Sequence, residues 1–294
     1  MAIGPIPVVL NGAAGPGHAR AEIERLQASF ARAGLHAEVF NDVDIAEAAR
    51  RALRDRPPLV VAGGGDGTLN AVANVVRGTD TVLGVLPLGT LNHFAKDLGL
   101  PLELDAAVGV IKAGRRAAVD VGEVNGRAFL NNASLGIYPD IVRERTRQQR
   151  RFGRSKMSAL LWATLAAMNR APLLSLRLEL DQRAHECRAP FVFIGNNEYV
   201  MEGFNIGTRS RLDAGHLSVY TTQHCHRGGL LILALRALFG RLRQSEDFTV
   251  LQARTLRVET PHKRLLVATD GEVAIMETPL EFRLLPRSLQ VIVP

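Results

Sequence analysis

The stretch VVAGGGDGTLN, residues Val60–Asn70, decides how the first part of this sequence folds. Its apolar start has the composition of a buried strand, and four glycines follow within five positions, at Gly63, Gly64, Gly65 and Gly67. Glycines let a backbone turn sharply and approach a ligand without hindrance from a Cβ atom. The segment therefore predicts a buried strand, a tight loop and a helix that begins where the loop ends.

The same glycine loop has the composition of a phosphate-binding site. Its amide groups, together with the N-terminus of the following helix, form a concave surface that favours anions. Asp66 stands among the glycines, where we see no structural need for an acidic side chain. A plain tight turn is the alternative interpretation. Two standard nucleotide motifs are excluded, because His18 stands where GxxxxGK[ST] needs Lys and Thr68 stands where GxGxxG needs its last Gly.

Short apolar segments alternate with helical patterns around this loop, which favours a parallel sheet covered by helices. We expect strands at Ile6–Leu10, Ala37–Phe40, Leu59–Ala62 and Val82–Leu86, and helices at His18–Ala33, Ile45–Leu53, Leu69–Val76, Leu91–Leu98 and Leu104–Ala113. Loops at the carboxyl ends of parallel strands gather at one edge of the sheet. Asn11–Gly17 and PLGTLNHFA, residues Pro87–Ala95, should therefore converge there with the glycine loop.

From Ala117 onward the sequence predicts a β-rich domain, because short strand-like segments follow one another closely. The expected strands are Val119–Val124, Arg127–Asn132, Leu174–Leu180, Arg188–Ile194, Leu217–Thr221, Thr255–Thr260, Leu265–Thr269, Leu280–Leu285 and Leu289–Val293, interrupted by helices at Ser155–Asn169 and Gly228–Leu242. The predicted fold has two domains. An N-terminal α/β parallel sheet with flanking helices covers residues 1–122, and a C-terminal β-rich sandwich covers residues 123–294, whose last strand could return to the first domain.

The bulk composition fits a globular protein with polyanionic partners. The 294 residues include 36 Lys and Arg against 29 Asp and Glu, which gives a formal charge of +7. Apolar stretches fall short of the roughly 18–20 residues that a membrane-spanning helix needs. Cys187 and Cys225 are isolated, which argues against a disulfide framework and favours a reducing compartment. We expect a cytoplasmic protein that is soluble or peripheral at the inner face of the membrane.

Four motifs in this order resemble the diacylglycerol kinase catalytic family, which includes bacterial lipid kinases and sphingosine kinases: GGGDGTLN, PLGTLNHFAKDLGLP, NNASLG (Asn131–Gly136) and TDGE (Thr269–Glu272). The resemblance covers nearly the whole chain, and NAD kinases share the GGDG loop more distantly. It implies a kinase that transfers a phosphoryl group from ATP, with Mg²⁺, to the hydroxyl of diacylglycerol or a related lipid. It also implies that the nucleotide lies in the interdomain cleft and that the β-rich domain carries the lipid pocket.

The resemblance further assigns roles to individual residues. The expected nucleotide contacts are Asn11, Gly63, Gly64, Gly65, Asp66, Gly67, Thr68, Gly89, Thr90 and Asn92. Asp66 would help to organise Mg²⁺, and Glu272 would be the general base, a role that phosphoryl transfer to a hydroxyl also needs on chemical grounds. Many members have Asp where this chain has His93, and DDG where this chain has Asp213–Gly215 (DAG). The acidic network around Mg²⁺ therefore differs here, and a second, structural Mg²⁺ is not expected.

A basic segment suggests how the protein could reach a lipid. Arg143–Lys156 carries seven Arg or Lys in fourteen residues, and the apolar segment Met157–Leu165 follows directly. This order suits docking to anionic phospholipid headgroups, although a solvated charged helix explains it equally well. We expect no nucleic-acid partner and leave a homodimer open. Two alternatives to a lipid kinase stay open as well: an NAD kinase-like enzyme with a soluble substrate, and a catalytically weak, lipid-binding regulatory protein.

Overall fold

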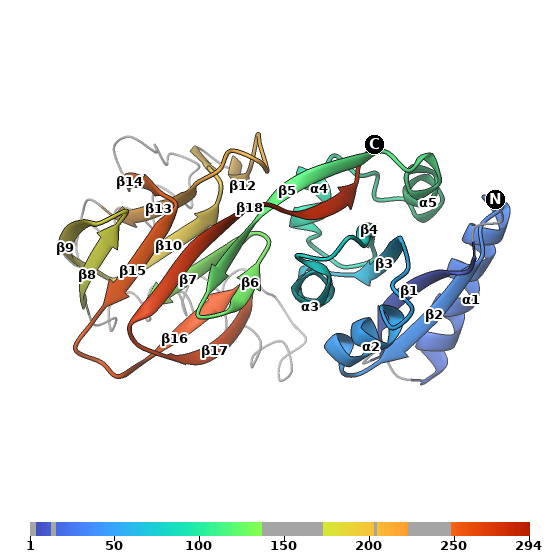
Figure 1. Ribbon diagram of the computed structural model, residues 1–294, viewed down its shortest axis with the longest axis horizontal. Helices are drawn as coiled ribbons and strands as arrows, with labels where there is room; N and C mark the ends of the chain where they lie inside the picture. The colour runs from blue at the N-terminus through green and yellow to red at the C-terminus, as the bar shows by residue number, and fades with distance from the viewer. Residues whose placement is uncertain (1–3, 13–15, 137–172, 203–204, 223–247) are drawn as a thin grey trace, which may run out of the picture. The chain divides into compact units, whose positions relative to one another are not determined.

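The computed structural model describes residues 4–12, 16–136, 173–202, 205–222 and 248–294 (Figure 1). Contacts divide the chain into two compact units: the first unit is Met1–Val121 with Leu285–Pro294, and the second unit is Gly122–Leu284. Strands β5 (Arg116–Val124) and β18 (Leu280–Ile292) contribute residues to both units. The two predicted helical insertions, Ser155–Asn169 and Gly228–Leu242, lie outside the described residues.

Parallel strands form the centre of the first unit. They pair in the order β2-β1-β3-β4, with bounds β1 Ile6–Asn11, β2 Ala37–Asp42, β3 Leu59–Gly64 and β4 Val82–Pro87. All these pairs are parallel, and Val291 of β18 pairs in parallel with Leu83 of β4. Each of the four predicted strands is present, and each runs one or two residues further at its carboxyl end. The predicted parallel α/β architecture is confirmed.

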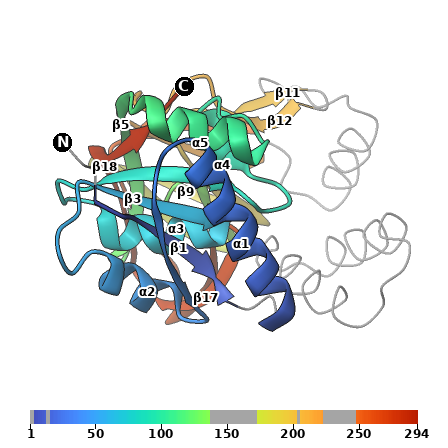
Figure 2. The same ribbon diagram turned by 90° about the vertical axis from the view of Figure 1, so that its right-hand side faces the viewer.

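Helices lie along this sheet (Figure 2), and their apolar side chains bury it. α1 (Pro16–Arg32) and α5 (Leu104–Ala113) contact each other and share one core cluster with β1 and β3, which includes Phe30, Val108, Val8 and Val61. α2 (Ile45–Ala52) and α3 (Asp66–Val76) contact each other; α2 also contacts β1 and β2, and α3 contacts β1, β3 and β4. The short helix α4 (His93–Asp97) follows β4. Within the described residues, no helix has both the length and the apolar character needed to cross a membrane.

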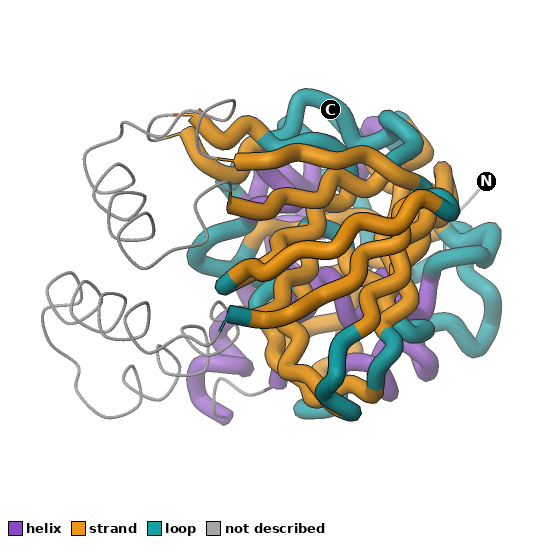
Figure 3. Tube along the Cα trace, turned by 90° about the vertical axis from the view of Figure 1, so that its left-hand side faces the viewer, coloured by secondary structure: helices purple, strands orange, loops and turns teal. Residues whose placement is uncertain are grey.

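Two antiparallel sheets form the sandwich of the second unit (Figure 3). One has the order β14-β13-β10-β7-β16-β17, with bounds β14 Phe248–Ala253, β13 Leu217–Thr222, β10 Phe191–Asn196, β7 Asn132–Gly136, β16 Arg264–Thr269 and β17 Glu272–Glu277. The other has the order β18-β15-β8-β9, with bounds β15 Thr255–Glu259, β8 Leu174–Leu180 and β9 Arg183–Ala189. β6 (Arg127–Phe129) pairs with β5, and β11 (Val200–Glu202) pairs with β12 (Asn205–Thr208). Buried side chains of both sheets, among them Leu178 and Ile194, form one core, and the predicted sandwich is confirmed.

Several strand boundaries differ from the prediction, for identifiable reasons. The single strand expected at Arg127–Asn132 is divided into β6 and β7, because the amides of the residues between them bind the carboxylate of Asp270. The strand expected at Arg188–Ile194 is divided at Pro190, which has no N–H to donate. The sequences of β14 and β17 alternate only weakly between apolar and polar residues, so neither strand was predicted.

The C-terminal strand is continuous where two strands are expected. β18 spans Leu280–Ile292, and the left-handed residue Arg287 (φ 50°) lies within it. The amide of Arg287 donates to Oδ1 of the buried Asp120 at 2.8 Å, so the irregular point keeps its hydrogen bond. Residues beyond this point belong to the first unit.

Candidate active site

Three loops begin side by side at the carboxyl edge of the parallel sheet. In the sheet register Leu10 lies beside Gly63, and Gly63 lies beside Leu86. Strands β1, β3 and β4 therefore end at nearly the same level. Asn11, which is exposed, the glycine loop and the loop after Pro87 follow directly. The predicted convergence of the glycine loop with the loop after Pro87 is confirmed by their backbone contact, whereas residues 13–15 of the first loop lie outside the described residues.

The glycine loop and the loop after β4 contact each other backbone to backbone. A Cβ atom added to Gly89 would lie 2.3 Å from Cα and 2.9 Å from the amide nitrogen of Gly65. A Cβ atom on Gly64 would lie 2.6 Å from Oγ1 of Thr68, which is itself buried. Close packing alone therefore requires glycine at positions 64 and 89, whether or not a ligand is bound.

Asp66 is the first residue of α3, and its carboxylate joins these two loops. Oδ1 accepts a hydrogen bond from the amide of Phe94 at 3.1 Å, and Oδ2 accepts one from the amide of His93 at 3.2 Å. Both amides belong to the first turn of α4, whose own N-cap residue, Asn92, makes no side-chain cap bond. The inference that Asp66 has no structural need was wrong, because its carboxylate caps α4. A carboxylate has about four acceptor sites, so Asp66 can still bind a cation.

Asn92 shapes the loop from within. It is 4% exposed and has a left-handed backbone with φ 52°. Its Nδ2 donates to the carbonyls of Pro87 at 3.2 Å and Gly89 at 2.8 Å, while Oδ1 accepts from the amide of Gly89 at 3.0 Å. These bonds commit its side chain to the loop, whereas Thr90 and Leu91 of the same loop are exposed.

The N-terminus of α3 has the properties of an anion site. Its N-cap residue, Gly65, has no side chain to cap the first turn, and the first main-chain bond of the helix runs from Leu69 to Gly65 at 3.1 Å. The first amides of a helix carry partial positive charge because they point out of its end. Gly67 and Thr68 lie in this first turn. Such an arrangement suits a phosphate group.

The fourth motif forms a hairpin turn in the second unit. Asp270 (φ 48°) and Gly271 (φ 83°) are both left-handed, which a tight turn between β16 and β17 requires. The carboxylate of Asp270 accepts hydrogen bonds from the amides of Leu130, Asn131 and Asn132 at 2.7, 2.8 and 3.0 Å. Burial raises the pKa of Asp270 to about 6, against the lowering effect of these three bonds. The turn is therefore anchored on the segment between β6 and β7.

Glu272 begins β17 directly after this turn. Its side chain is 55% exposed, and its Oε2 accepts a hydrogen bond from Nη2 of Arg127 at 2.6 Å. The carboxylate is thus both held in place and accessible, the two properties that a proton acceptor for an incoming hydroxyl needs. Arg127 on β6 was missed from the sequence, because a single Arg in a strand carries no motif.

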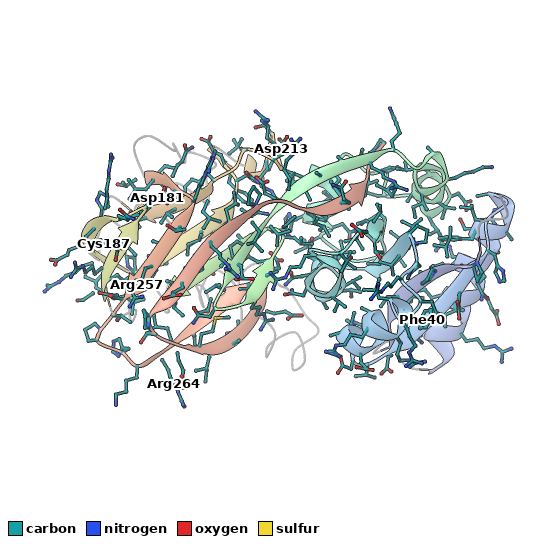
Figure 4. All side chains as sticks on the ribbon, in the orientation of Figure 1. Phe40, Asp181, Cys187, Asp213, Arg257 and Arg264 are labelled. Carbon is teal, nitrogen blue, oxygen red and sulfur yellow. The ribbon has the colours of Figure 1, made fainter. Side chains whose placement is uncertain are left out.

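The two positions that depart from the family pattern, His93 and Asp213–Gly215, form hydrogen bonds or ion pairs with other residues. The exposed His93 is linked to Asp66 through its amide. Asp213, labelled in Figure 4, pairs with Arg211 at 3.1 Å. The amide of Ala214 donates to Oδ1 of Asn197 at 3.0 Å. Among the described residues, no three His, Cys, Asp or Glu side chains gather as metal ligands. Mg²⁺ is commonly held by one or two carboxylates together with substrate phosphates, and Asp66 can supply one such carboxylate.

Two family models together match most of the chain. Residues 5–124 match the diacylglycerol kinase catalytic domain, and residues 135–293 match the YegS C-terminal NAD kinase beta sandwich-like domain. The second match alone covers more than half of the chain.

Similar proteins match over nearly their full length. A diacylglycerol kinase of Staphylococcus aureus strain MRSA252 is 25% identical over 299 residues, which cover 98% of this chain and 91% of that protein. A crystal structure from Bacillus anthracis strain Sterne, described provisionally as a diacylglycerol kinase, has a TM-score of 0.76 at 22% identity and covers 100% of this chain and 97% of that one. Another structure, of a diacylglycerol kinase from the same strain, has a TM-score of 0.72 at 20% identity, with 100% and 98% coverage. These structures share the fold.

Proposed function

Because the chain belongs to the diacylglycerol kinase catalytic domain family, we propose that it is an ATP-dependent lipid kinase. Its acceptor is the hydroxyl of diacylglycerol or a related lipid. The observation that carries the proposal is the backbone contact between the glycine loop and the loop after β4, which Asp66 reinforces at the N-terminus of α3. The first amides of α3, which follow the glycines of this loop, suit the phosphates of ATP.

The proposed reaction assigns tasks to Glu272, Arg127 and Asp66. The lipid hydroxyl oxygen forms a bond to the γ-phosphorus of ATP, the bond from that phosphorus to the β,γ-bridging oxygen breaks, and ADP leaves. Glu272 accepts the hydroxyl proton, and Arg127 holds the Glu272 carboxylate in place. Bound Mg²⁺ would neutralise charge on the phosphate oxygens, and Asp66 is the residue that we propose to hold it. The proposal therefore assigns ATP to the glycine loop and the acceptance of the hydroxyl proton to Glu272.

The partner that we propose beyond the lipid substrate is an anionic membrane surface. Arg143–Lys156 lies outside the described residues, so the support comes from its sequence alone. Each basic side chain near such a surface contributes about 1 kcal/mol. Charge reversal at Arg150 and Arg151 should therefore weaken binding to phosphatidylserine-containing vesicles and leave ATP binding unchanged. Equal losses of both would mean that the variant misfolds and that this docking role is unsupported.

A soluble substrate is the second candidate function. The model matched by residues 135–293 is described as an NAD kinase beta sandwich-like domain, so the fold of the second unit is compatible with a dinucleotide acceptor. A catalytically weak regulator is the third candidate, since Asp66 already caps α4 and His93 replaces an acidic residue. The soluble-substrate enzyme differs from the lipid kinase in its acceptor, and the lipid-binding regulator differs in transferring little or no phosphate.

One screen separates these candidates. The full-length protein is incubated with ATP, Mg²⁺ and a total lipid extract, and in parallel with NAD, and phosphorylated products are identified by mass spectrometry. We expect phosphorylated lipid with the wild type and at least about a hundredfold less with Glu272→Gln, which removes the proton acceptor without changing side-chain size. Phosphorylation of NAD alone would establish the soluble-substrate function. Absence of any product would favour the regulator.

A further inference from the structure

A buried arginine holds the segment that joins β6 to β7. Arg209 is only 6% exposed although it is charged. Its Nη1 donates to the carbonyls of Leu130 at 2.8 Å and Asn196 at 3.0 Å, and its Nη2 donates to Oδ1 of Asn131 at 2.8 Å. The guanidinium lies over the ring of Tyr199, 5.2 Å from its centroid. Burial of a charge is costly unless it is compensated in this way, so the fold specifies this position for an arginine.

The same segment is held from its other side by an anion. Asp270 accepts hydrogen bonds from the amides of residues Leu130, Asn131 and Asn132. Arg209 binds the Leu130 carbonyl and the Asn131 side chain. We call residues 130–132 the clamped segment, because a carboxylate fixes its N–H groups while a guanidinium fixes its acceptor groups.

The clamped segment connects to both groups that determine where Glu272 lies. Asp270 precedes Glu272 by two residues in the hairpin turn, so its three bonds fix the start of β17. Arg127, which holds the Glu272 carboxylate, lies on β6 immediately before the clamped segment. We propose that Arg209 is a positioning residue for the phosphoryl-transfer reaction, acting on Glu272 through the clamped segment. This role rests on the proposed function of Glu272 as the proton acceptor.

Lysine cannot reproduce the contacts of Arg209. The guanidinium directs separate N–H groups at a carbonyl pair and at a side-chain amide, whereas a lysine has one nitrogen at the end of a flexible chain. An Arg209→Lys variant keeps the buried charge but loses the separate N–H donors that fix the clamped segment. A displacement of about 1 Å at a catalytic group can lower turnover by about a hundredfold.

The test compares Arg209→Lys with a matched control, Arg211→Lys. Arg211 lies two residues away, but its side chain is 67% exposed and pairs with Asp213. We expect Arg209→Lys to lower kcat by about tenfold to a hundredfold with KM for ATP changed by less than about twofold. Arg211→Lys should have wild-type values. Wild-type kcat in Arg209→Lys, or an equal loss in both variants, would overturn the positioning role.

A double-mutant cycle with Glu272→Gln distinguishes positioning from general destabilisation. If Arg209 acts through Glu272, the lysine substitution has little further effect on the residual turnover of Glu272→Gln. If Arg209 only stabilises the fold, its effect multiplies with that of Glu272→Gln. The first result supports the proposal and the second overturns it.

Amide hydrogen exchange gives a readout that does not depend on activity. In Arg209→Lys, exchange should become faster at residues 130–132 and 270–272 and stay unchanged in β8. If that variant does not fold, Asn131→Ala, which removes one acceptor of the guanidinium, carries the same kinetic and exchange tests with a smaller expected effect. Unchanged exchange in the clamped segment would refute the clamp. A wild-type protein that phosphorylates no acceptor would instead refute the proposed function and the positioning role that rests on it.

Discussion

Replacing Gly89 by alanine tests whether the glycine loop and the loop after β4 form one tightly packed unit. The new Cβ atom would lie 2.3 Å from Cα of Gly65 and 2.8 Å from Oδ1 of Asn92. Carbon atoms in contact are normally about 3.5–4.0 Å apart, so the loops must separate by about 1 Å or more. The obstructing Cα and amide nitrogen of Gly65 belong to the backbone and cannot rotate away.

The size of the effect follows from this geometry. Overpacking a well-packed interior typically costs about 1–3 kcal/mol, and a backbone obstruction belongs at the upper end of that range, about 3 kcal/mol. For a chain of this length such a loss lowers the melting temperature by about 5 °C. Displacement of the amides at the start of α3 should also weaken ATP binding by at least about tenfold, or about 1.4 kcal/mol. Differential scanning fluorimetry with and without ATP measures both effects.

Two other glycines provide matched controls. A Cβ atom on Gly65 would lie 3.5 Å from Cα of Gly89, an ordinary contact, and Gly65 has an extended backbone with φ −88°. Gly65→Ala should therefore melt close to the wild type. Gly109 is exposed within α5 with nothing within 4 Å of the added atom, so Gly109→Ala should stabilise by about 0.5–1 kcal/mol. A Gly89→Ala protein that melts within about 1 °C of the wild type and binds ATP normally would refute the packing argument.

Three further predictions concern charged side chains. Asp66→Asn removes one acceptor of the α4 cap, so its free energy of unfolding should fall by about 1 kcal/mol. It also removes the negative charge proposed to hold the metal, so kcat should fall by orders of magnitude. Near-wild-type turnover would exclude the metal role. Burial raises the pKa of Asp270 from 3.8 to about 6, so the folded state binds the carboxyl proton more tightly than the unfolded chain does. The stability contributed by this protonation is complete below about pH 4 and is lost as the pH rises through 6. The free energy of unfolding, measured with urea across this pH range, should therefore change by up to about 3 kcal/mol less in Asp270→Asn than in the wild type. The same pH dependence in both proteins would contradict the raised pKa. Arg127→Gln should lower kcat by about tenfold with unchanged ATP affinity in calorimetry, and an unchanged kcat would show that the Arg127 contact with Glu272 does not matter for turnover.

The parallel sheet could be predicted because its inner strands β1, β3 and β4 are buried on both faces. Val60, Val61 and Ala62 form an uninterrupted apolar segment that is fully buried, and the glycines after them mark its end. The convergence of loops also followed, since parallel strands place their carboxyl ends at one edge. The strand ends were predicted one or two residues short, because Asn11, Gly64 and Pro87 are typical of turns but still pair in the sheet.

The features that could not be predicted depend on contacts between distant residues. The carboxylate of Asp66 caps a helix that begins 27 residues later, a contact that no local pattern indicates. Asp270 interrupts the strand expected at Arg127–Asn132 through hydrogen bonds that span about 140 residues. Arg209 has the sequence context of a surface residue, and only the folded second unit shows it buried. Pro190 was the one signal in the sequence that could have corrected a strand boundary.

Single-turnover transfer tests the central claim most directly. Wild-type protein in excess over ATP labelled in its γ-phosphate is mixed with diacylglycerol in detergent micelles and Mg²⁺, and the reaction is compared with that of Glu272→Gln. We expect the label to appear in the phosphorylated lipid with the wild type, and at least about a hundredfold more slowly with Glu272→Gln, while both proteins bind ATP equally. Equal transfer rates in the two proteins, or two proteins that bind lipid and transfer no label, would contradict the account.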